Sequence, residues 1–293
     1  MADAFKVSCL QFCAGADTDE NLAMIKALMG EAVGEGAHLV CLPEYAACYG
    51  MSKGRLEVGA EPEAHHPGLA ALRSMARQHD CWLLIGSIGV RRDDGMINNR
   101  SYLIDNKGDV RARYDKIHLF DVDLDGGESY RESASIKPGD RAVLVDTPFG
   151  RLGLTICYDL RFPQLYRTLA KAGAEMIFIP AAFTRKTGEA HWHTMVTSRA
   201  IETGAYIVAP CQCGDANGTL ARYGHSLIVG PWGEVLADGK ENVGIVTAEL
   251  DLAHVEAVRR KIPALTHDRL VEVELVTAGD GNVKQPSSHP SAS

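Results

Sequence analysis

The chain contains 293 residues, of which 46% are hydrophobic and 23% charged, a composition typical of a globular protein with a buried core. The 30 Lys and Arg residues against 38 Asp and Glu residues give a net charge of −8, and no basic patch occurs, which excludes a general nucleic-acid binder. The longest strongly apolar stretch, residues 176–183, is shorter than the roughly 20 residues that span a bilayer, so we expect no membrane association. Because no basic leader or cleavage site opens the sequence, we expect a cytoplasmic protein.

The cysteines predict neither disulfides nor a metal site. In a chain of this length without an export signal, we expect reduced, buried thiols. No two of them have Cys-x-x-Cys spacing and no His-Glu-x-x-His occurs, so we expect no zinc, and no other cofactor is implied. The eight cysteines are Cys9, Cys13, Cys41, Cys48, Cys81, Cys157, Cys211 and Cys213.

The first part of the chain alternates strand and helix patterns, which favours a layered α/β fold. The expected elements are a strand at 5–13, a helix capped by Thr18, a strand at 38–42, a helix at 67–79 and a strand at 81–90. Turn residues at 93–95 and 106–108 then predict an antiparallel meander.

The second part continues the alternation, and no internal linker interrupts it. We expect one domain over residues 1–278 and a disordered tail over 279–293, where Gly, Ser, Pro and Asn dominate. The expected elements are strands at 151–157, 175–180, 206–210 and 244–250, helices at 163–172, about 188–203 and 251–260, and a hairpin at 223–237 that turns at 231–233.

Polar residues end or follow three of these apolar runs, namely Glu44, Lys116 and Cys157. Strand ends are where α/β sheets bind ligands, so these residues are site candidates. A thiol needs a base or a nearby cation to react at neutral pH, and a carboxylate and an ammonium supply both. Spacing alone leaves the alternatives open, because a cysteine in this position is commonly buried packing and a lysine commonly solvated.

Three segments resemble the signature segments of the nitrilase (carbon–nitrogen hydrolase) superfamily and occur in the family's order. They are 42–45 (Leu-Pro-Glu-Tyr), 114–121 (Tyr-Asp-Lys-Ile-His-Leu-Phe-Asp) and 157–163 (Cys-Tyr-Asp-Leu-Arg-Phe-Pro). The resemblance runs from about Phe5 to Leu270. It implies a four-layer α-β-β-α sandwich with two sheets face to face, and a homodimer or larger homo-oligomer that pairs through a helix face.

The resemblance also implies roles for the three candidates: Glu44 as general base and acid, Lys116 as oxyanion stabiliser and Cys157 as nucleophile. The family's second glutamate matches Glu132, which would hold Lys116, although a solvated loop acid is the alternative. The amide N–H of Tyr158 directly follows the nucleophile, which makes it the natural second oxyanion donor.

Shorter matches narrow the resemblance to the branch that contains deaminated glutathione amidase and omega-amidase. The implied reaction is hydrolysis, by water, of a small carboxylate-bearing amide, with deaminated glutathione first and α-ketoglutaramate second; N-carbamoyl amino acids are a third possibility. Arg161 is a candidate partner for the substrate carboxylate. The alternative for Arg161 is a salt bridge to Asp159 or another acid that supports the Cys157 turn. The matching segments are 190–192, 199–203, 212–214 and 223–226.

Two rival interpretations compete with this one. Residues 50–54 fit the Gly-x-Ser-x-Gly pattern of serine hydrolases, but we expect Ser52 to lie in a loop rather than between a strand and a helix. A non-catalytic protein on the same fold would typically have lost a triad residue, and none is lost here. We expect His191, His193 and His225 to be structural.

Overall fold

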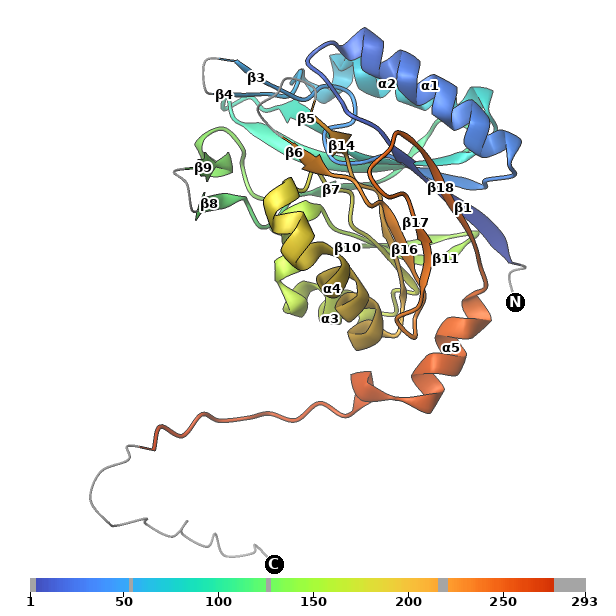
Figure 1. Cartoon of the computed structure of the whole chain (residues 1–293), viewed down its shortest axis with the longest axis vertical. Coiled ribbons are helices and arrows are strands. Elements are labelled where there is room, and N and C mark those ends of the chain that lie inside the picture. Colours follow the sequence, from blue (N-terminus) through green and yellow to red (C-terminus); the bar gives the residue numbers. More distant parts are fainter. Residues whose placement is uncertain (1–3, 53–54, 125–127, 216–220, 277–293) are drawn as a thin grey trace, which may run out of the picture.

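Two six-stranded β-sheets lie face to face, and a pair of α-helices covers the outer face of each (Figure 1). The predicted four-layer α-β-β-α sandwich is therefore confirmed. This computed structural model describes residues 4–52, 55–124, 128–215 and 221–276.

The first sheet has the strand order β18-β1-β2-β5-β6-β7. Strands β1, β2 and β5 run parallel in its middle, and the remaining pairs are antiparallel. The predicted meander is confirmed as β5, β6 and β7. The strands are β1 (Phe5–Gln11), β2 (Leu39–Cys41), β5 (Trp82–Arg91), β6 (Ile97–Ile104), β7 (Val110–Asp115) and β18 (Gly244–Leu250).

The second sheet has the order β10-β11-β12-β13-β16-β17, with β11, β12 and β13 parallel in its middle. Its strands are β10 (Val143–Thr147), β11 (Gly150–Leu154), β12 (Met176–Phe178), β13 (Tyr206–Ala209), β16 (Leu227–Val229) and β17 (Val235–Asp238). Three small sheets pair β3 (Gly50–Ser52) with β4 (Arg55–Glu57), β8 (Asp121–Leu124) with β9 (Glu128–Arg131), and β14 (Cys213–Gly214) with β15 (Arg222–Tyr223).

Apolar residues at helical spacing attach the helices to the sheets. Helices α1 (Thr18–Gly34) and α2 (Pro67–Gln78) share a buried cluster with the outer face of the first sheet. Helices α3 (Pro163–Lys171) and α4 (Arg185–Thr203) join the larger cluster that also fills the space between the sheets. Trp192 of α4 is fully buried there.

Three predicted boundaries need correction. Asp17, not Thr18, caps α1, because the Asp17 carboxylate accepts hydrogen bonds from the amides of Asp19 and Glu20. Helix α4 begins three residues before Gly188, and a Cβ on that glycine would lie 2.3 Å from the Tyr223 ring, so Gly188 permits close packing rather than starting the helix. Tyr223 itself pairs in β15, so the predicted hairpin begins only with β16.

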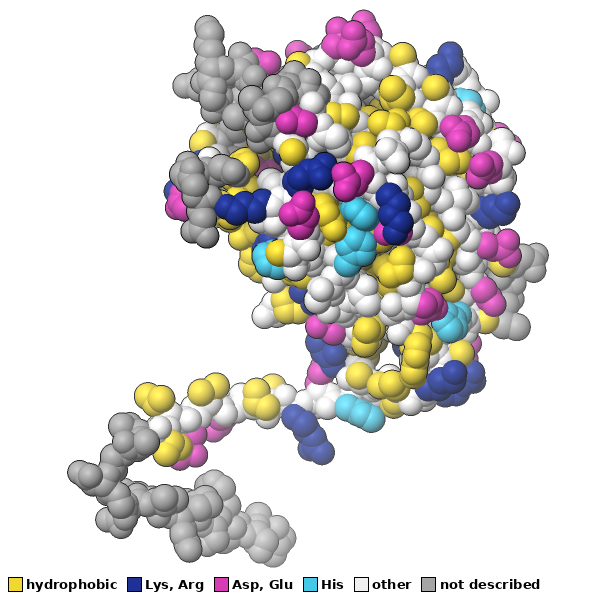
Figure 2. Space-filling view, viewed as in Figure 1, with side chains coloured by type: hydrophobic (Ala, Val, Ile, Leu, Met, Phe, Trp, Pro, Cys, Tyr) yellow, Lys and Arg dark blue, Asp and Glu magenta, His cyan; other side chains and the backbone are white. Residues whose placement is uncertain are grey.

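The chain leaves the sandwich after β18. Helix α5 (Leu252–Lys261) lies at its edge, and residues 267–276 extend away from it (Figure 1). Apolar side chains stand exposed along this last segment (Figure 2), namely Leu270, Val271, Val273, Leu275 and Val276. The predicted tail at 279–293 lies outside the described residues. No helix in the described part of the chain is long and apolar enough to cross a membrane.

The carboxyl ends of the parallel strands lie in one region between the sheets. Glu44 follows β2 of the first sheet, and Cys157 follows β11 of the second. Gly86 in β5 lies between the two approaching loops, where a Cβ would fall 2.0 Å from the Leu42 carbonyl oxygen and 2.6 Å from Pro180. Only glycine allows the sheets to bring these loops so close.

Candidate active site

A cavity of about 620 Å³ opens where these strand ends meet. Glu44, Lys116, Glu132 and Cys157 all line its wall. The structure thus brings together four residues that are far apart in the sequence. A volume of this size suits a small-molecule substrate.

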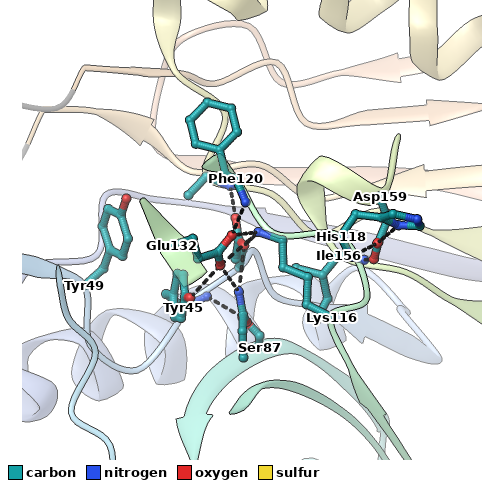
Figure 3. A network of polar contacts seen from close by, with 12 residues as sticks. Tyr45, Tyr49, Ser87, Lys116, His118, Phe120, Glu132, Ile156 and Asp159 are labelled. Carbon is teal, nitrogen blue, oxygen red and sulfur yellow. Dashed lines mark hydrogen bonds and ion pairs between the residues drawn. The ribbon is translucent and has the colours of Figure 1, made fainter. Parts of the chain in front are cut away.

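Lys116 lies between two carboxylates in the cavity wall. Its Nζ donates to Glu44 Oε1 at 2.9 Å and to Glu132 Oε2 at 2.8 Å, and its side chain is only 2% exposed (Figure 3). Burial alone would lower the pKa of Lys116, but the charges of Glu132 and Glu44 raise it well above its ordinary value. Lys116 is therefore an ammonium ion at neutral pH.

Each carboxylate is fixed by further donors. Asn99 Nδ2 bridges the two, at 2.9 Å from Glu44 Oε1 and 3.2 Å from Glu132 Oε1. The Ala182 amide donates to Glu44 Oε2, and the Phe120 amide to Glu132 Oε2. These hydrogen bonds hold the Glu44 and Glu132 side chains each in one orientation. The Glu132 side chain is only 8% exposed within this network, which is not the environment of a solvated loop acid.

Cys157 begins the 3₁₀ turn η3 (Cys157–Arg161) with a left-handed backbone, φ +46°. A non-glycine residue in this region stores strain, which is a feature of functional turns. Its amide donates to the Pro180 carbonyl at 2.9 Å, which ties the turn to the strand end of β12. Burial raises the pKa of the Cys157 thiol well above its ordinary value, Glu44 raises it further, and Lys116 lowers it in part. The resting thiol is therefore protonated.

Asp159 connects this turn to the Lys116 segment (Figure 3). The fully buried carboxylate accepts from the Ile156 amide at 2.9 Å, the Tyr114 hydroxyl at 2.6 Å and the His118 amide at 3.0 Å. A single side chain thus holds the position of the nucleophile relative to the segment that carries Lys116.

Tyr158 and Arg161 are not part of the cavity wall. The Arg161 guanidinium lies over the rings of Tyr158 and Phe183, 5.8 and 5.7 Å from their centres, and 3.3 Å from His191 Nδ1. No described carboxylate lies within 4.0 Å of it, and Asp159 pairs with His118 instead. This placement supports neither a direct contact between the Arg161 side chain and the substrate nor the Arg161 salt bridge suggested from the sequence.

Two residues of the site were missed from the sequence. Asn99 belongs to a strand with ordinary alternation, so nothing in its surroundings distinguishes it. Arg222 lines the same cavity but follows a stretch without recognisable pattern. Asp159 was expected to support the Cys157 turn through Arg161, and it contacts the Ile156 amide and the Tyr114 hydroxyl instead.

The serine-hydrolase alternative is not supported by the backbone. Ser52 ends the short strand β3, and the next element is β4, not the helix that a nucleophile turn requires. The expectation that Ser52 lies in a loop was wrong.

A possible metal-binding group lies away from the cavity. Candidate ligand atoms of His193, His225 and Asp238 lie within 4.8 Å of one another, and none of these residues lines the cavity. Asp238 already accepts from His225 Nδ1 at 2.9 Å and from the Lys240 ammonium at 2.7 Å. Burial alone would raise the pKa of Asp238, but Lys240 and His225 lower it to about 2. The group is a surface ion-pair cluster.

Comparison with known proteins agrees with the geometry of the cavity. The family model described as carbon-nitrogen hydrolase matches residues 6–260. The chain belongs to the carbon–nitrogen hydrolase family. It is 38% identical over 268 residues to a deaminated glutathione amidase of Yersinia enterocolitica, covering 90% of this chain and 93% of that protein.

Solved structures give the same result. The NitFhit protein of Caenorhabditis elegans superposes with a TM-score of 0.84 at 36% identity, over 91% of this chain and 65% of that longer chain. Nit3 of Saccharomyces cerevisiae, a member of branch 10 of the nitrilase superfamily, gives 0.80 at 27% identity, over 91% and 97%. This chain is thus an enzyme, a carbon–nitrogen hydrolase of amidase type, and a non-catalytic role has no support.

Proposed function

We propose that the protein hydrolyses the amide of a small carboxylate-bearing molecule, with deaminated glutathione as the favoured substrate. The observation that carries this proposal is the meeting of Glu44, Lys116 and Cys157 in one cavity. Similarity to proteins named deaminated glutathione amidase supports the substrate. An omega-amidase acting on α-ketoglutaramate is the second candidate, and an N-carbamoyl amino acid hydrolase the third.

In the first half of the reaction, Glu44 takes the proton of the Cys157 thiol and the thiolate attacks the amide carbonyl carbon. A base is required because the resting thiol is protonated. The tetrahedral oxyanion accepts hydrogen bonds from the Lys116 ammonium and the Tyr158 amide. Glu44 then returns the proton to the nitrogen, the C–N bond breaks, and the acyl group stays on Cys157 as a thioester. The leaving group is the amine of cysteinylglycine when deaminated glutathione is the substrate, and ammonia when α-ketoglutaramate is.

In the second half, water attacks the thioester carbonyl while Glu44 accepts one of its protons. The same oxyanion donors act again, the C–S bond breaks, and the proton returns to sulfur. The carboxylic acid product leaves with the thiol regenerated. Glu132 keeps Lys116 charged and in place throughout, so it acts as a positioning residue. Arg161 stacks behind Phe183 and Tyr158 and supports the wall without touching the substrate.

The molecular setting is part of the same proposal. A single hydrolase domain covers residues 1–278 and needs no metal or other cofactor. Seven free cysteines are buried, Cys157 among them, which suits a reducing, cytoplasmic compartment.

The exposed apolar side chains at 270–276 favour a homodimer that covers them. Light scattering at micromolar concentration tests the assembly, and a monomer would contradict it.

A substrate panel tests the function directly. Product release is measured as cysteinylglycine for deaminated glutathione, and as ammonia for α-ketoglutaramate, N-carbamoyl amino acids and simple nitriles. We expect the highest kcat/KM for deaminated glutathione, and expect Cys157→Ala to lose about 10⁴-fold or more while Cys81→Ala keeps activity. A preference for a nitrile or an N-carbamoyl substrate would refute the substrate, and an active Cys157→Ala variant would refute the mechanism.

A further inference from the structure

Arg222 is a buried cation with unused hydrogen-bonding capacity in the wall of the active-site cavity. The residue is 2% exposed, and its Nη2 donates to the Tyr49 hydroxyl while the guanidinium carbon lies 4.5 Å from the centre of the Tyr49 ring. Its Nε is buried without a partner, and no carboxylate among the described residues lies within 4.0 Å. Burying an arginine without a carboxylate partner costs free energy, unless a ligand supplies the missing hydrogen-bond acceptor and negative charge.

The other cations of the cavity wall are already neutralised. Lys116 lies between Glu44 and Glu132, and Arg131 donates to both carboxylate oxygens of Asp123, at 2.7 and 2.8 Å. Arg222 alone among the described lining cations lacks such a partner. Tyr49 does not balance its charge, because burial raises the pKa of that hydroxyl to about 12 although Arg222 opposes the shift.

A second positive feature adjoins Arg222. Its backbone forms a bridge with Thr184, the N-cap residue of the 19-residue helix α4. Thr184 and Thr187 both line the cavity, so the positive end of the helix dipole faces the same space. No side chain caps the helix there: the Thr184 hydroxyl pairs with that of Thr187 rather than with a backbone amide. The guanidinium and the helix end favour the same kind of ligand, an anion.

We propose that Arg222 and the first turn of α4 bind the carboxylate of the substrate, while the amide reaches Cys157, which lines the same cavity. This assignment rests on the proposed amidase function. It replaces Arg161, which lies outside the cavity wall.

The charge distribution also sets the orientation of the substrate. Lys116 with Glu44 and Glu132 carries a formal charge of −1, so a carboxylate is repelled from the catalytic end and drawn to Arg222. The neutral amide is then the group left to face the thiol. Specificity thus arises from repulsion at one end as well as attraction at the other.

The test compares two amides that differ only in the distal group. Glutaramate carries a carboxylate where pentanamide carries a methyl group, and the ratio of their kcat/KM values reports recognition of that carboxylate. We expect wild-type enzyme to prefer glutaramate, and Arg222→Gln to lower the ratio by about 10- to 100-fold, mainly through KM. Arg222→Lys should recover only part of the ratio, because the planar fork is lost.

Arg161→Gln is the matched control, since Arg161 also stacks on aromatic rings but lies outside the cavity wall. It should leave the ratio unchanged. An equal loss on both amides in Arg222→Gln would overturn the proposal, and so would a wild-type enzyme with no preference, although the amidase function would then stand.

Binding in a variant that cannot turn over separates this proposal from the proposed function. Titration calorimetry measures glutaramate binding to Cys157→Ala with and without Arg222→Gln. We expect the second substitution to weaken binding at least tenfold, and unchanged binding would refute the anion site. If wild-type enzyme hydrolysed neither amide, the proposed function would fail while this measurement still decided the role of Arg222.

Discussion

The two ends of the cavity are built in different ways. At the catalytic end, Glu44, Lys116 and Cys157 each follow a strand of a six-stranded sheet, and hydrogen bonds fix every charged atom. At the other end, Arg222 and Tyr49 come from short segments outside the large sheets, and the guanidinium is incompletely paired. The difference suggests that the sheets carry the reaction and that the connecting segments select the substrate.

The largest effect should come from the base at the catalytic end. Glu44→Gln keeps the shape of the side chain but cannot accept the thiol proton, so we expect kcat to fall by about 10²- to 10⁴-fold for charged and neutral amides alike. Single-turnover kinetics should show that thioester formation and breakdown both slow. Glu256→Gln on the exposed face of α5 is the control. A loss limited to carboxylate-bearing substrates would break the proposed division of labour.

This division also explains what could be predicted from the sequence. Glu44 and Cys157 follow apolar runs whose periodicity is visible, and the adjoining residues match family segments, so the catalytic end and the α-β-β-α fold were predictable. Asn99 and Arg222 gave no such signal. Their roles depend on which distant side chains they meet, Glu44 and Glu132 in one case and Tyr49 in the other. Contacts of that kind exist only once the chain has folded.

Asn99 provides the next test, because it links the two carboxylates beside Lys116. Asn99→Ala removes hydrogen bonds to charged groups, so we expect kcat to fall by about 10- to 100-fold, again with no change in the preference for glutaramate. Asn98→Ala is a close control: it is also buried, but it lies on the other face of β6, where its side chain accepts from Arg92. Equal losses in both variants would mean that Asn99 serves the fold only.

A smaller effect concerns the protonation of the catalytic thiol. Burial raises the pKa of Cys81 from 9.0 to about 12, and that of Cys157 is raised as well. Above pH 9.0 the unfolded chain loses thiol protons that the folded protein keeps. The contribution of these thiols to the free energy of unfolding is therefore fully present below pH 9.0, and it falls as pH rises toward the folded pKa. Each thiol contributes a slope of about 1.4 kcal/mol per pH unit in this window.

Urea unfolding between pH 8 and 10.5 measures this slope. We expect Cys157→Ala and Cys81→Ala each to flatten it by a similar amount. If Cys81→Ala flattened the slope and Cys157→Ala did not, the catalytic thiol would already be ionised in the folded enzyme. Glu44 would then be needed to protonate the leaving nitrogen and to activate water, but not to activate the thiol.

The smallest effect is expected at Arg161, which lies beside the cavity without lining it. Its guanidinium stacks on Phe183, a residue of the cavity wall, and on Tyr158, whose amide is a proposed oxyanion donor. Loss of two cation–π contacts in Arg161→Gln should lower kcat/KM by only about 2- to 5-fold, and equally for glutaramate and pentanamide. The uniform loss follows because the wall shifts slightly while the carboxylate contact at Arg222 is untouched. A selective loss on glutaramate would instead assign the substrate carboxylate to Arg161. The turn that carries the nucleophile would then also select the substrate, and the separation between catalysis and selection would not hold.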